Sequence, residues 1–351
     1  MNSKDKLKGA TVKKEQSMFK IAIIGPGSIS RTYAEALKDS KTVKIQAIAG
    51  RDTEKGRAMA AEYGVSYYTD QEELYEKEEL DAVLICTPTF THEEMVRRAI
   101  AHRVHVMCEK PFVLDAETAK SLISEAEVAG VSLMVMHVVR FWPEYVKIKE
   151  MIVNGELGEI KNVYLNRLSS HPTWATWHRD PKKSGGGLYD LHIHDIDFLY
   201  HVFGEVESVY AVGKQEESGC FNNVSTVMKF VSGVSAVVEG FMDITGAFGF
   251  TTNVRVNGSE AAVEMLNKAV NLADGAIGKA NKLVEYRKEE PTQIIDVEKY
   301  DPYARETEYF AECVQSGTKN KIVPNQDVVY VLQVLAAIRE SLENGSPVMV
   351  K

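Results

Sequence analysis

The chain from residue 19 to residue 136 alternates short apolar runs with amphipathic stretches, and few folds accommodate this rhythm. The apolar runs predict strands at residues 19–24, 43–49, 82–86, 104–107 and 132–136. The stretches between them predict helices at residues 29–38, 53–63, 91–102 and 115–129. Strands that are apolar on both faces belong to a parallel sheet covered by helices on both sides. We therefore predict a doubly wound α/β domain over residues 18–140.

The pattern changes after Pro143, where one further helix is followed by segments of alternating apolar and polar residues. These segments predict strands at residues 160–168, 206–212, 224–230, 234–241 and 252–256. Period-2 alternation is typical of an antiparallel sheet with one covered face. Helical periodicity returns at residues 301–315 and 327–342, while residues 267–293 have no clear pattern. We expect residues 141–351 to form a second α/β domain with a large open, mainly antiparallel sheet, and residues 1–17 to be a polar tail.

Charge, apolar run length and cysteine spacing each argue against one kind of partner or site. A formal charge of −9 argues against a nucleic-acid surface, which needs a basic face. No apolar run is long enough to cross a bilayer, and the lysine-rich start lacks the apolar core of a signal peptide, so we expect no membrane partner and a cytoplasmic location. The four cysteines are widely separated and form no C-x-x-C pair, which predicts buried free thiols.

A glycine turn joins the first predicted strand to the first predicted helix. It reads Gly25-Pro26-Gly27-Ser28-Ile29-Ser30. Gly25 can form the tight turn, and Gly27 lets the backbone approach a pyrophosphate at the helix N-terminus, where Ser28 and Ile29 begin the helix. Ser30 stands in place of the third glycine of this kind of motif. The turn therefore predicts a dinucleotide cofactor.

The end of the second strand bears on which dinucleotide is bound. A carboxylate about 20 residues beyond the glycines would bind the adenosine ribose. Here the chain reads Gly50-Arg51-Asp52. Gly50 and Arg51 leave room and positive charge for a 2′-phosphate, which favours NADP, whereas Asp52 can still bind the bare ribose of NAD. An exposed turn with no cofactor role is the third interpretation.

Lys110 follows the fifth predicted strand, in the stretch Cys108-Glu109-Lys110-Pro111. A lysine at the carboxyl edge of a parallel sheet faces the crevice where such folds bind ligands. Its ammonium group can hold a substrate hydroxyl and stabilise developing alkoxide charge. The alternative is an ordinary surface lysine.

Asp190 and His194 follow a triple glycine, Gly185-Gly186-Gly187. On a helix they are i, i+4 neighbours, so the carboxylate can orient the imidazole and favour its protonated form. Removing a hydride from an alcohol leaves a proton for an acid/base group to take, and histidine suits that role. Asp197, one turn on, braces His194 or lies on a solvated face.

His192 and His194 also form an H-x-H pair, which on a strand would bind a metal. The amphipathic continuation after His194 favours a helix, on which the two rings diverge. We therefore predict no metal site and assign His192 no role.

The chain resembles the glucose-fructose oxidoreductase and inositol dehydrogenase family, Gfo/Idh/MocA, from Phe19 to its end. The resemblance rests on the glycine turn, on Thr87-Pro88 with His92, on Glu109-Lys110-Pro111, on Arg140-Phe141 with Pro143, and on the triple glycine with the acidic and histidine residues after it. It implies a Rossmann domain, then an α/β domain whose open sheet makes dimer or tetramer contacts. It implies Lys110, Asp190 and His194 as catalytic residues. The cofactor contacts that we expect are Gly25, Gly27, Ser28, Ile29, Arg51, Thr87, Pro88, His92, Glu109 and Lys110.

The chain departs from the family pattern at two positions. Thr89 stands where asparagine is common, and His192 replaces a usual glycine. The first bears on cofactor contacts and the second on the pocket wall.

Together these features predict an NAD(P)-dependent oxidoreductase that moves a hydride between nicotinamide and a hydroxyl or carbonyl carbon of a sugar, a polyol or a related small molecule. A glycosidase that uses the same bound cofactor and a cofactor-binding regulator without turnover are the alternatives. Candidate substrate contacts are Arg140, Trp142, Trp174 and Trp177, because aromatic faces suit sugar rings. Packing at the domain interface is the other interpretation of these side chains. We expect a homodimer or homotetramer.

Overall fold

The first 120 described residues wind around a six-stranded parallel sheet. The computed structural model describes residues 17–171, 176–246, 248–271 and 277–350. The strand order is β3-β2-β1-β4-β5-β6, and every neighbouring pair is parallel. The strands are β1 (Phe19–Ile24), β2 (Val43–Ala49), β3 (Ser66–Tyr68), β4 (Ala82–Ile85), β5 (His105–Glu109) and β6 (Leu133–Met136). The chain order reverses between β1 and β4, and the crevice at such a reversal is where open α/β sheets bind ligands.

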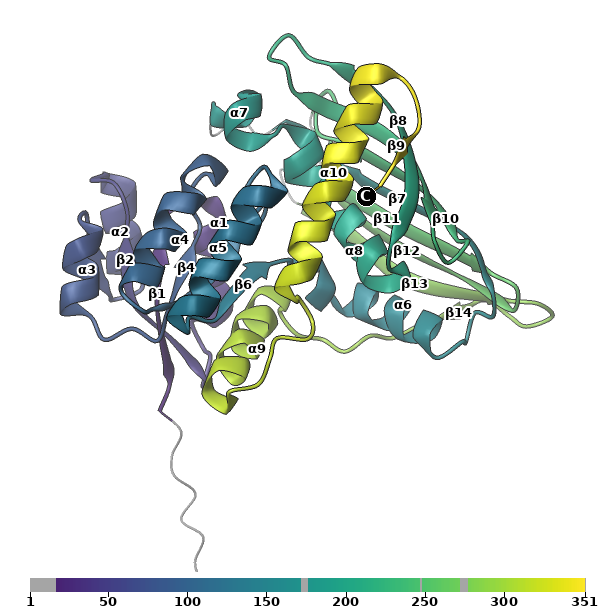
Figure 1. Cartoon of the computed structure of the whole chain (residues 1–351). Coiled ribbons are helices and arrows are strands. Elements are labelled where there is room, and N and C mark those ends of the chain that lie inside the picture. Colours follow the sequence, from purple (N-terminus) through teal and green to yellow (C-terminus); the bar gives the residue numbers. More distant parts are fainter. Residues whose placement is uncertain (1–16, 172–175, 247, 272–276, 351) are drawn as a thin grey trace, which may run out of the picture.

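Helices cover both faces of this sheet, which confirms the predicted doubly wound arrangement (Figure 1). They are α1 (Ser28–Leu37), α2 (Glu54–Glu62), α3 (Gln71–Lys77), α4 (His92–Ala101) and α5 (Ala116–Ala129). The sequence did not predict β3 or α3. The strand β3 is three residues long, lies at the sheet edge and buries none of its side chains fully, so it has no continuous apolar run to read.

A second sheet of nine strands follows, in the order β14-β13-β12-β11-β7-β10-β9-β8-β15. Among the described residues of this sheet only β7 and β10 pair in parallel, so the prediction of a mainly antiparallel sheet is confirmed. The strands are β7 (Ile160–Leu168), β8 (Val206–Gln215), β9 (Phe221–Phe230), β10 (Ser235–Phe241), β11 (Thr251–Gly258), β12 (Ala261–Asn271), β13 (Ile277–Arg287), β14 (Gln293–Ile294) and β15 (Val348–Met349).

The strands β12 and β13 occupy most of the segment that had no readable pattern. In β13 the inward position of Glu285 is charged and buried, and its carboxylate accepts a hydrogen bond from Arg287 at 2.7 Å. A charged residue at an inward position breaks the apolar alternation, which explains why the sequence did not reveal this strand.

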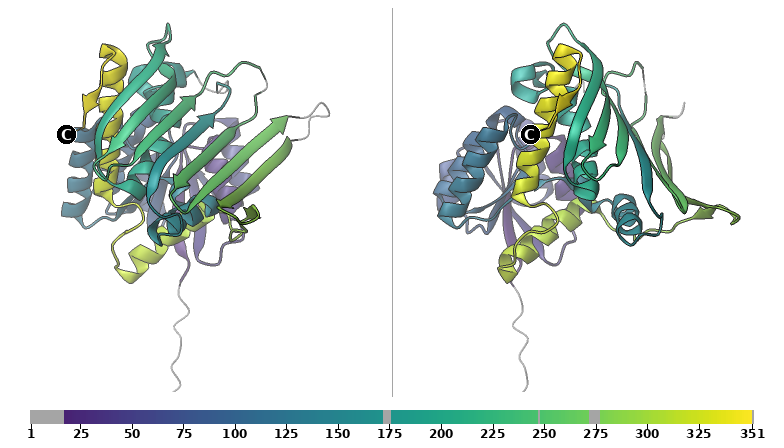
Figure 2. Two further views of the ribbon diagram at one scale, coloured as in Figure 1. Left: turned by 90° about the vertical axis from the view of Figure 1, so that its right-hand side faces the viewer. Right: turned by 45° about the vertical axis from the view of Figure 1, so that its right-hand side comes forward.

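Helices cover one face of the second sheet and leave the other uncovered (Figure 2, left). The covering helices are α6 (Pro143–Val153), α8 (Ile193–Phe203) and α10 (Asn325–Asn344), with α7 (Pro181–Ser184) at one end and α9 (Pro302–Ser316) nearer the first sheet. Because α10 contacts β8 and α8 as well as α5, and α9 contacts α1, the C-terminal helices join the two halves. The linear domain boundary near residue 140 stays a prediction, and residues 1–16 of the predicted tail lie outside the described part.

Buried ion pairs fix the helices between the sheets. Arg140, on the short helix η2 (Val138–Phe141), pairs with Asp197 of α8 and Asp327 of α10, each at 2.7 Å. Arg167 of β7 pairs with Asp195 of α8 at 2.8 Å. Removing one partner of such a pair leaves an uncompensated buried charge, which costs about 3–5 kcal/mol. These pairs therefore restrict α8 to one position.

The four cysteines are buried free thiols, as predicted. None of the helices in the described ranges is long and apolar enough to cross a bilayer.

Candidate active site

The glycine turn after β1 lies against the loop after β4. Gly25 has φ of 98°, and a Cβ on it would lie 2.8 Å from the backbone nitrogen of Thr87. Both facts exclude a side chain at this position. A Cβ on Gly27, in contrast, would meet nothing within 4 Å, so the start of α1 has open space in front of it.

Ser30 replaces the third glycine without disturbing the turn. Its side chain is fully buried, and its hydroxyl accepts a hydrogen bond from Gly27 N at 2.6 Å and donates one to Gly27 O at 2.9 Å. Ser28 and Ile29 begin α1 directly after this capped glycine. An open helix N-terminus at the strand-order reversal is the arrangement that binds a pyrophosphate. These residues therefore fit a dinucleotide.

The turn after β2 has no room for a carboxylate at its first position. A Cβ on Gly50 would lie 2.4 Å from Cδ of Pro26. Asp52 is two residues further on and already pairs with Arg57 at 2.8 Å. Arg51 is exposed, and its carbonyl oxygen accepts a hydrogen bond from the hydroxyl of Tyr67 at 2.7 Å.

His92 braces two loops from within. Its ring is 1% exposed, with Nε2 2.8 Å from the carbonyl oxygen of Thr87 and Nδ1 3.0 Å from that of Pro111. Thr87 and Pro88 lie at the carboxyl end of β4, and Lys110 and Pro111 at that of β5. This burial argues against the direct cofactor contact predicted for the His92 side chain, and indicates that it positions the residues around it.

Lys110 and Asp190 form an ion pair between the two halves of the molecule. The Lys110 ammonium donates hydrogen bonds to Oδ1 of Asp190 at 2.9 Å and to its backbone oxygen at 2.7 Å. The side chains are 16% and 23% exposed, so the pair faces an opening. Burial acts to raise the pKa of Asp190, but the charge and hydrogen bond of Lys110 outweigh it and lower the pKa below its usual value.

The predicted contact between Asp190 and His194 is wrong. The chain forms a π-helical turn, η4 (Leu188–His192), before α8 begins at Ile193. A π turn is wider than an α turn, so residues four apart no longer lie one above the other. Asp190 consequently faces Lys110, while Nδ1 of His194 has no hydrogen-bond partner among the described residues.

The predicted protonated state of His194 is also wrong. Burial is the main cause that lowers its pKa well below the usual value, and the positive charges of Lys110 and Arg167 lower it further. His194 is therefore a neutral imidazole beside a lysine cation. A neutral imidazole can accept a proton.

His192 and Asp197 both lie inside the protein. His192 is 0% exposed, and its Nε2 lies 2.9 Å from the hydroxyl of Thr226 on β9. Asp197 is 0% exposed and paired with Arg140, so it neither braces His194 nor lies on a solvated face. Within the described ranges, no three histidine, cysteine or acidic side chains are grouped to hold a metal ion.

The candidate substrate contacts differ in how far the structure buries them. Arg140 has a side-chain exposure of 0% within its ion pairs, which argues against substrate contact. Trp142 is half-buried, with its ring 5.8 Å from the Arg167 guanidinium. Trp177 is half-buried and reaches across to Phe90 of the first half, 6.4 Å between ring centroids. Trp174 lies outside the described residues.

Comparison with known proteins identifies the family. Residues 19–137 match the model of an oxidoreductase family with an NAD-binding Rossmann fold, Gfo/Idh/MocA, and residues 145–264 match the C-terminal domain of the same family. The chain belongs to the Gfo/Idh/MocA oxidoreductase family.

Full-length relatives agree with this assignment. The chain is 30% identical to a myo-inositol 2-dehydrogenase of Thermotoga maritima over 93% of this chain and 96% of that protein. It is 31% identical to a D-xylose 1-dehydrogenase (NADP⁺) 2 of Haloferax volcanii, over 86% and 90%. A crystal structure of a putative NADPH-dependent oxidoreductase from Desulfitobacterium hafniense shares the fold, with a TM-score of 0.85, 21% identity, and coverage of 95% of this chain and 98% of that one.

Some residues near the site of this family member were not predicted from the sequence. His178, on the short helix η3 (Trp177–Arg179), has Nδ1 4.0 Å from Oδ2 of Asp190. Tyr33 donates a hydrogen bond to Glu109 at 2.8 Å, and Glu306 lies on the other side of the same hydroxyl at 2.7 Å. His178 is next to Trp177, which the sequence indicates as a candidate substrate contact, but Glu306 lies in an ordinary helix pattern that gives no such signal.

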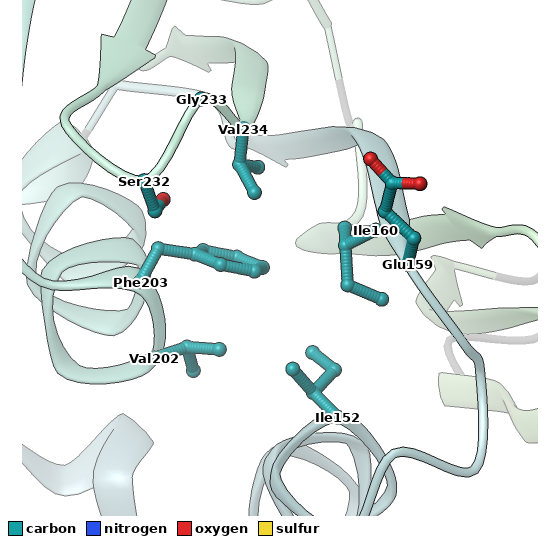
Figure 3. A pocket seen from close by; sticks show the side chains of 8 residues that line it. All are labelled: Ile152, Glu159, Ile160, Val202, Phe203, Ser232, Gly233 and Val234. Carbon is teal, nitrogen blue, oxygen red and sulfur yellow. The ribbon is translucent and has the colours of Figure 1, made fainter.

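A separate apolar cavity of about 380 Å³ lies away from these residues (Figure 3). Ile152, Ile160 and Phe203 point into it from the ends of α6, β7 and α8, and Val234 points into it from the residue before β10. It contains no titratable group besides Glu159, so it offers no acid/base chemistry.

Alanine substitution at the two glycines of the turn should affect different properties, namely stability at Gly25 and nucleotide binding at Gly27. Gly25→Ala forces an alanine into a left-handed conformation and against Thr87, which should destabilise the protein by roughly 2 kcal/mol or more. Gly27→Ala meets open space and should leave the unfolding temperature unchanged, yet weaken nucleotide binding about tenfold or more, because the Cβ occupies the pyrophosphate's place. Thermal unfolding and nucleotide fluorescence titration measure the two effects. Unchanged nucleotide affinity in Gly27→Ala would contradict a pyrophosphate at this turn.

Proposed function

We propose that this oxidoreductase is a dehydrogenase of sugars or polyols, in which Lys110, Asp190 and His194 act on the substrate hydroxyl. The observation that carries the proposal is the Lys110–Asp190 ion pair beside a neutral His194 at the carboxyl edge of β5. A bound nicotinamide supplies the hydride acceptor or donor. The substrate and the catalytic roles below are part of the proposal.

Each of the three residues has its own task. Lys110 donates a hydrogen bond to the substrate oxygen and stabilises the negative charge that grows on it during oxidation. Asp190 holds the ammonium group in position and balances its charge. His194, already neutral, accepts the hydroxyl proton as the carbon loses its hydride. In the reverse direction the same imidazole returns a proton to the carbonyl oxygen.

The substrate class is proposed from two supports. The relatives described above are named as a myo-inositol dehydrogenase and a xylose dehydrogenase, one acting on a polyol and one on a sugar. Trp177, which stacks on His178 and lies 6.4 Å from Phe90 between ring centroids, offers an aromatic side chain of the kind that packs on sugar C–H groups. Trp142 and Trp174 stay candidate contacts.

A second candidate function has one observation in its favour. His178 gives Asp190 an imidazole neighbour at 4.0 Å, so the site has a further group for proton transfer. A relative from Mediterraneibacter gnavus named 2,7-anhydro-N-acetylneuraminate hydratase is 31% identical over 52% of this chain and 49% of that protein. A hydratase or glycosidase that oxidises its substrate only transiently would bind the nucleotide and give no net change in nicotinamide absorbance.

Lys110→Ala and His194→Ala should each bind nucleotide normally and lose turnover by roughly 100-fold or more, since each removes a group that acts on the reacting oxygen. Lys120→Ala, which removes an exposed lysine on α5, is the control and should keep full activity. The measurement combines nucleotide titration with an absorbance screen of polyols and sugars. Retained activity in both variants would remove the proposed mechanism, and binding without turnover in the unmodified protein would favour the second candidate.

We propose NADP as the preferred cofactor. Gly50 has no room for the carboxylate that would bind the ribose of NAD, and Asp52 is held by Arg57. Arg51 is exposed at the same turn, where a guanidinium can pair with a 2′-phosphate through charge-assisted hydrogen bonds.

Arg51→Ala should therefore weaken NADP binding roughly tenfold or more and change NAD binding little, because only NADP has the phosphate. The dissociation constants of both nucleotides, measured by fluorescence, give the ratio. Arg98→Ala, on α4, is the matched control. An equal loss for both nucleotides would show that Arg51 does not read the phosphate.

We propose that the uncovered face of the nine-stranded sheet binds a second copy of the chain. The side chains of Tyr210, Val227 and Val237 are 40%, 49% and 41% exposed, and they lie opposite one another across β8, β9 and β10. Tyr164 of β7 continues the same row, with Arg255 over its ring at 5.2 Å. A row of apolar side chains across an open sheet is typical of an interface. The cytoplasmic location stays a prediction.

Light scattering should give about two or four times the chain mass of 39.1 kDa. The pair Val227→Lys and Val237→Lys, made together, should reduce the mass to that of one chain, because two charges would have to be buried. Val128→Lys changes a valine that is 89% exposed on α5 and should have no effect. An unchanged mass in the double variant places the contact elsewhere.

A further inference from the structure

One tyrosine hydroxyl lies between two buried carboxyl groups behind the catalytic lysine. The hydroxyl of Tyr33 on α1 is 2.8 Å from Oε1 of Glu109, at the end of β5, and 2.7 Å from Oε1 of Glu306, on α9. Tyr33 and Glu306 are 0% exposed and Glu109 is 7% exposed. Water therefore does not mediate these contacts, and the hydrogens must come from the three side chains themselves.

The number of hydrogens in this cluster sets a constraint. Each of the two short O···O contacts needs one hydrogen, and the tyrosine hydroxyl has a single one to donate. If both carboxyl groups were ionised, one of them would face the lone pairs of Tyr33 without a hydrogen between them. At least one carboxyl group therefore carries a proton.

The surroundings show which carboxyl group that is. Oε2 of Glu109 accepts a hydrogen bond from the backbone N–H of Lys110 at 3.0 Å, and the ammonium group of the same residue acts on it. Oε2 of Glu306 has no hydrogen-bond partner in the described ranges. A negative charge is thus stabilised on Glu109 and not on Glu306.

We propose that Glu306 is a positioning residue that stays protonated at neutral pH, donates its carboxyl hydrogen to Tyr33, and so directs the tyrosine hydrogen to an ionised Glu109 beside Lys110. The chain of donors then runs in one direction, from Glu306 through Tyr33 to Glu109. The proton never leaves Glu306 during turnover. The cluster keeps a fixed negative charge next to the catalytic ammonium group and ties α9, 273 residues distant from Tyr33 in sequence, to the cofactor side.

The groups around Glu306 agree with this direction. The charges of the cluster interact with Asp301, which caps α9, with Tyr303 on α9, and with the thiol of Cys86 directly after β4. Burial first, and then the charge of Glu109, raise the pKa of Glu306 well above its usual value, and only a hydrogen bond donated by Tyr33 to the carboxylate would act to lower it. Burial also raises the pKa of Glu109. The charge of Lys110 acts to lower this pKa, and the charge of Asp190 acts to raise it. No cation acts on Glu306 among these neighbours.

The protonation of Glu306 can be measured without cofactor or substrate. A negative result would therefore contradict this inference and leave the proposed function untouched. A protonated carboxyl group has an infrared C=O band that is separate from the carboxylate bands. The difference spectrum of the unmodified protein minus Glu306→Gln at pH 7 should show this band, and the difference against Glu312→Gln, an exposed glutamate on the same helix, should not. Absence of the band from the first difference spectrum overturns the proposal.

The pH dependence of stability gives an independent measurement. Because the folded pKa of Glu306 is raised, its contribution to stability is complete below the unfolded value of about 4.3 and is lost as pH rises toward the folded value. The glutamine amide keeps a donor for Tyr33 and does not ionise. The unfolding temperature of Glu306→Gln should therefore rise relative to the unmodified protein from pH 4.5 to pH 8. A constant difference overturns the proposal.

The positioning role rests on the proposed catalytic role of Lys110 and has its own readout. Glu306→Gln should keep kcat and KM within about twofold at pH 7, because the donor is conserved. Glu306→Leu removes the donor, frees Tyr33 to turn, and should raise the KM for nucleotide roughly tenfold. Equal losses of activity in both variants would show a purely structural role and contradict the proposal. If Glu306→Leu does not fold, a loss of activity in Glu306→Gln alone contradicts the proposal.

Discussion

The ion pair between Lys110 and Asp190 is the contact on which the site depends, because its two residues come from different halves of the molecule. Lys110 directly follows β5 of the parallel sheet, and Asp190 belongs to a π-helical turn that packs on the antiparallel sheet. Neither side chain has another opposite charge within 3.5 Å in the described part. The pair therefore exists only when both halves are folded and joined, and the site forms with it.

The helices that follow Asp190 are held by buried charges. The position of α8 is fixed from two sides, by Arg140 through Asp197 and by Arg167 through Asp195. Apolar side chains of the same size would give comparable stability, since buried ion pairs gain little net energy. What the pairs add is direction, because a bidentate guanidinium–carboxylate contact permits one geometry where apolar packing permits several. Because His194 directly precedes Asp195 on α8, the same ion pairs fix the position of its backbone.

The sequence predicted five of the six strands of the first sheet, because those strands carry apolar runs that the helices on both faces bury, whereas the edge strand β3 has no such run. It selected Lys110, Asp190 and His194 as candidates but did not predict their contacts. The Asp190–His194 pairing assumed an α-helix, and no property of the residues 188–192 marks the wider π turn that separates them. Arg140 illustrates the same difficulty, since an arginine at a domain junction has the same sequence pattern whether it faces a ligand or two buried carboxylates. The contact of Glu306 could not be predicted from the sequence, because its partner, Tyr33, is 273 residues away along the chain.

The charges around His194 bear on the direction of proton transfer. Two cations, Lys110 and Arg167, lower its pKa, and the carboxylates Asp190 and Asp195 that balance them are each hydrogen-bonded to their own cation and not to the imidazole. An acid/base group with a lowered pKa is in its accepting form across neutral pH. In the proposed oxidation, negative charge that develops on the substrate oxygen offsets the positive charge with which Lys110 acts on the imidazole. The histidine then takes up the hydroxyl proton against less net positive charge than in the resting site.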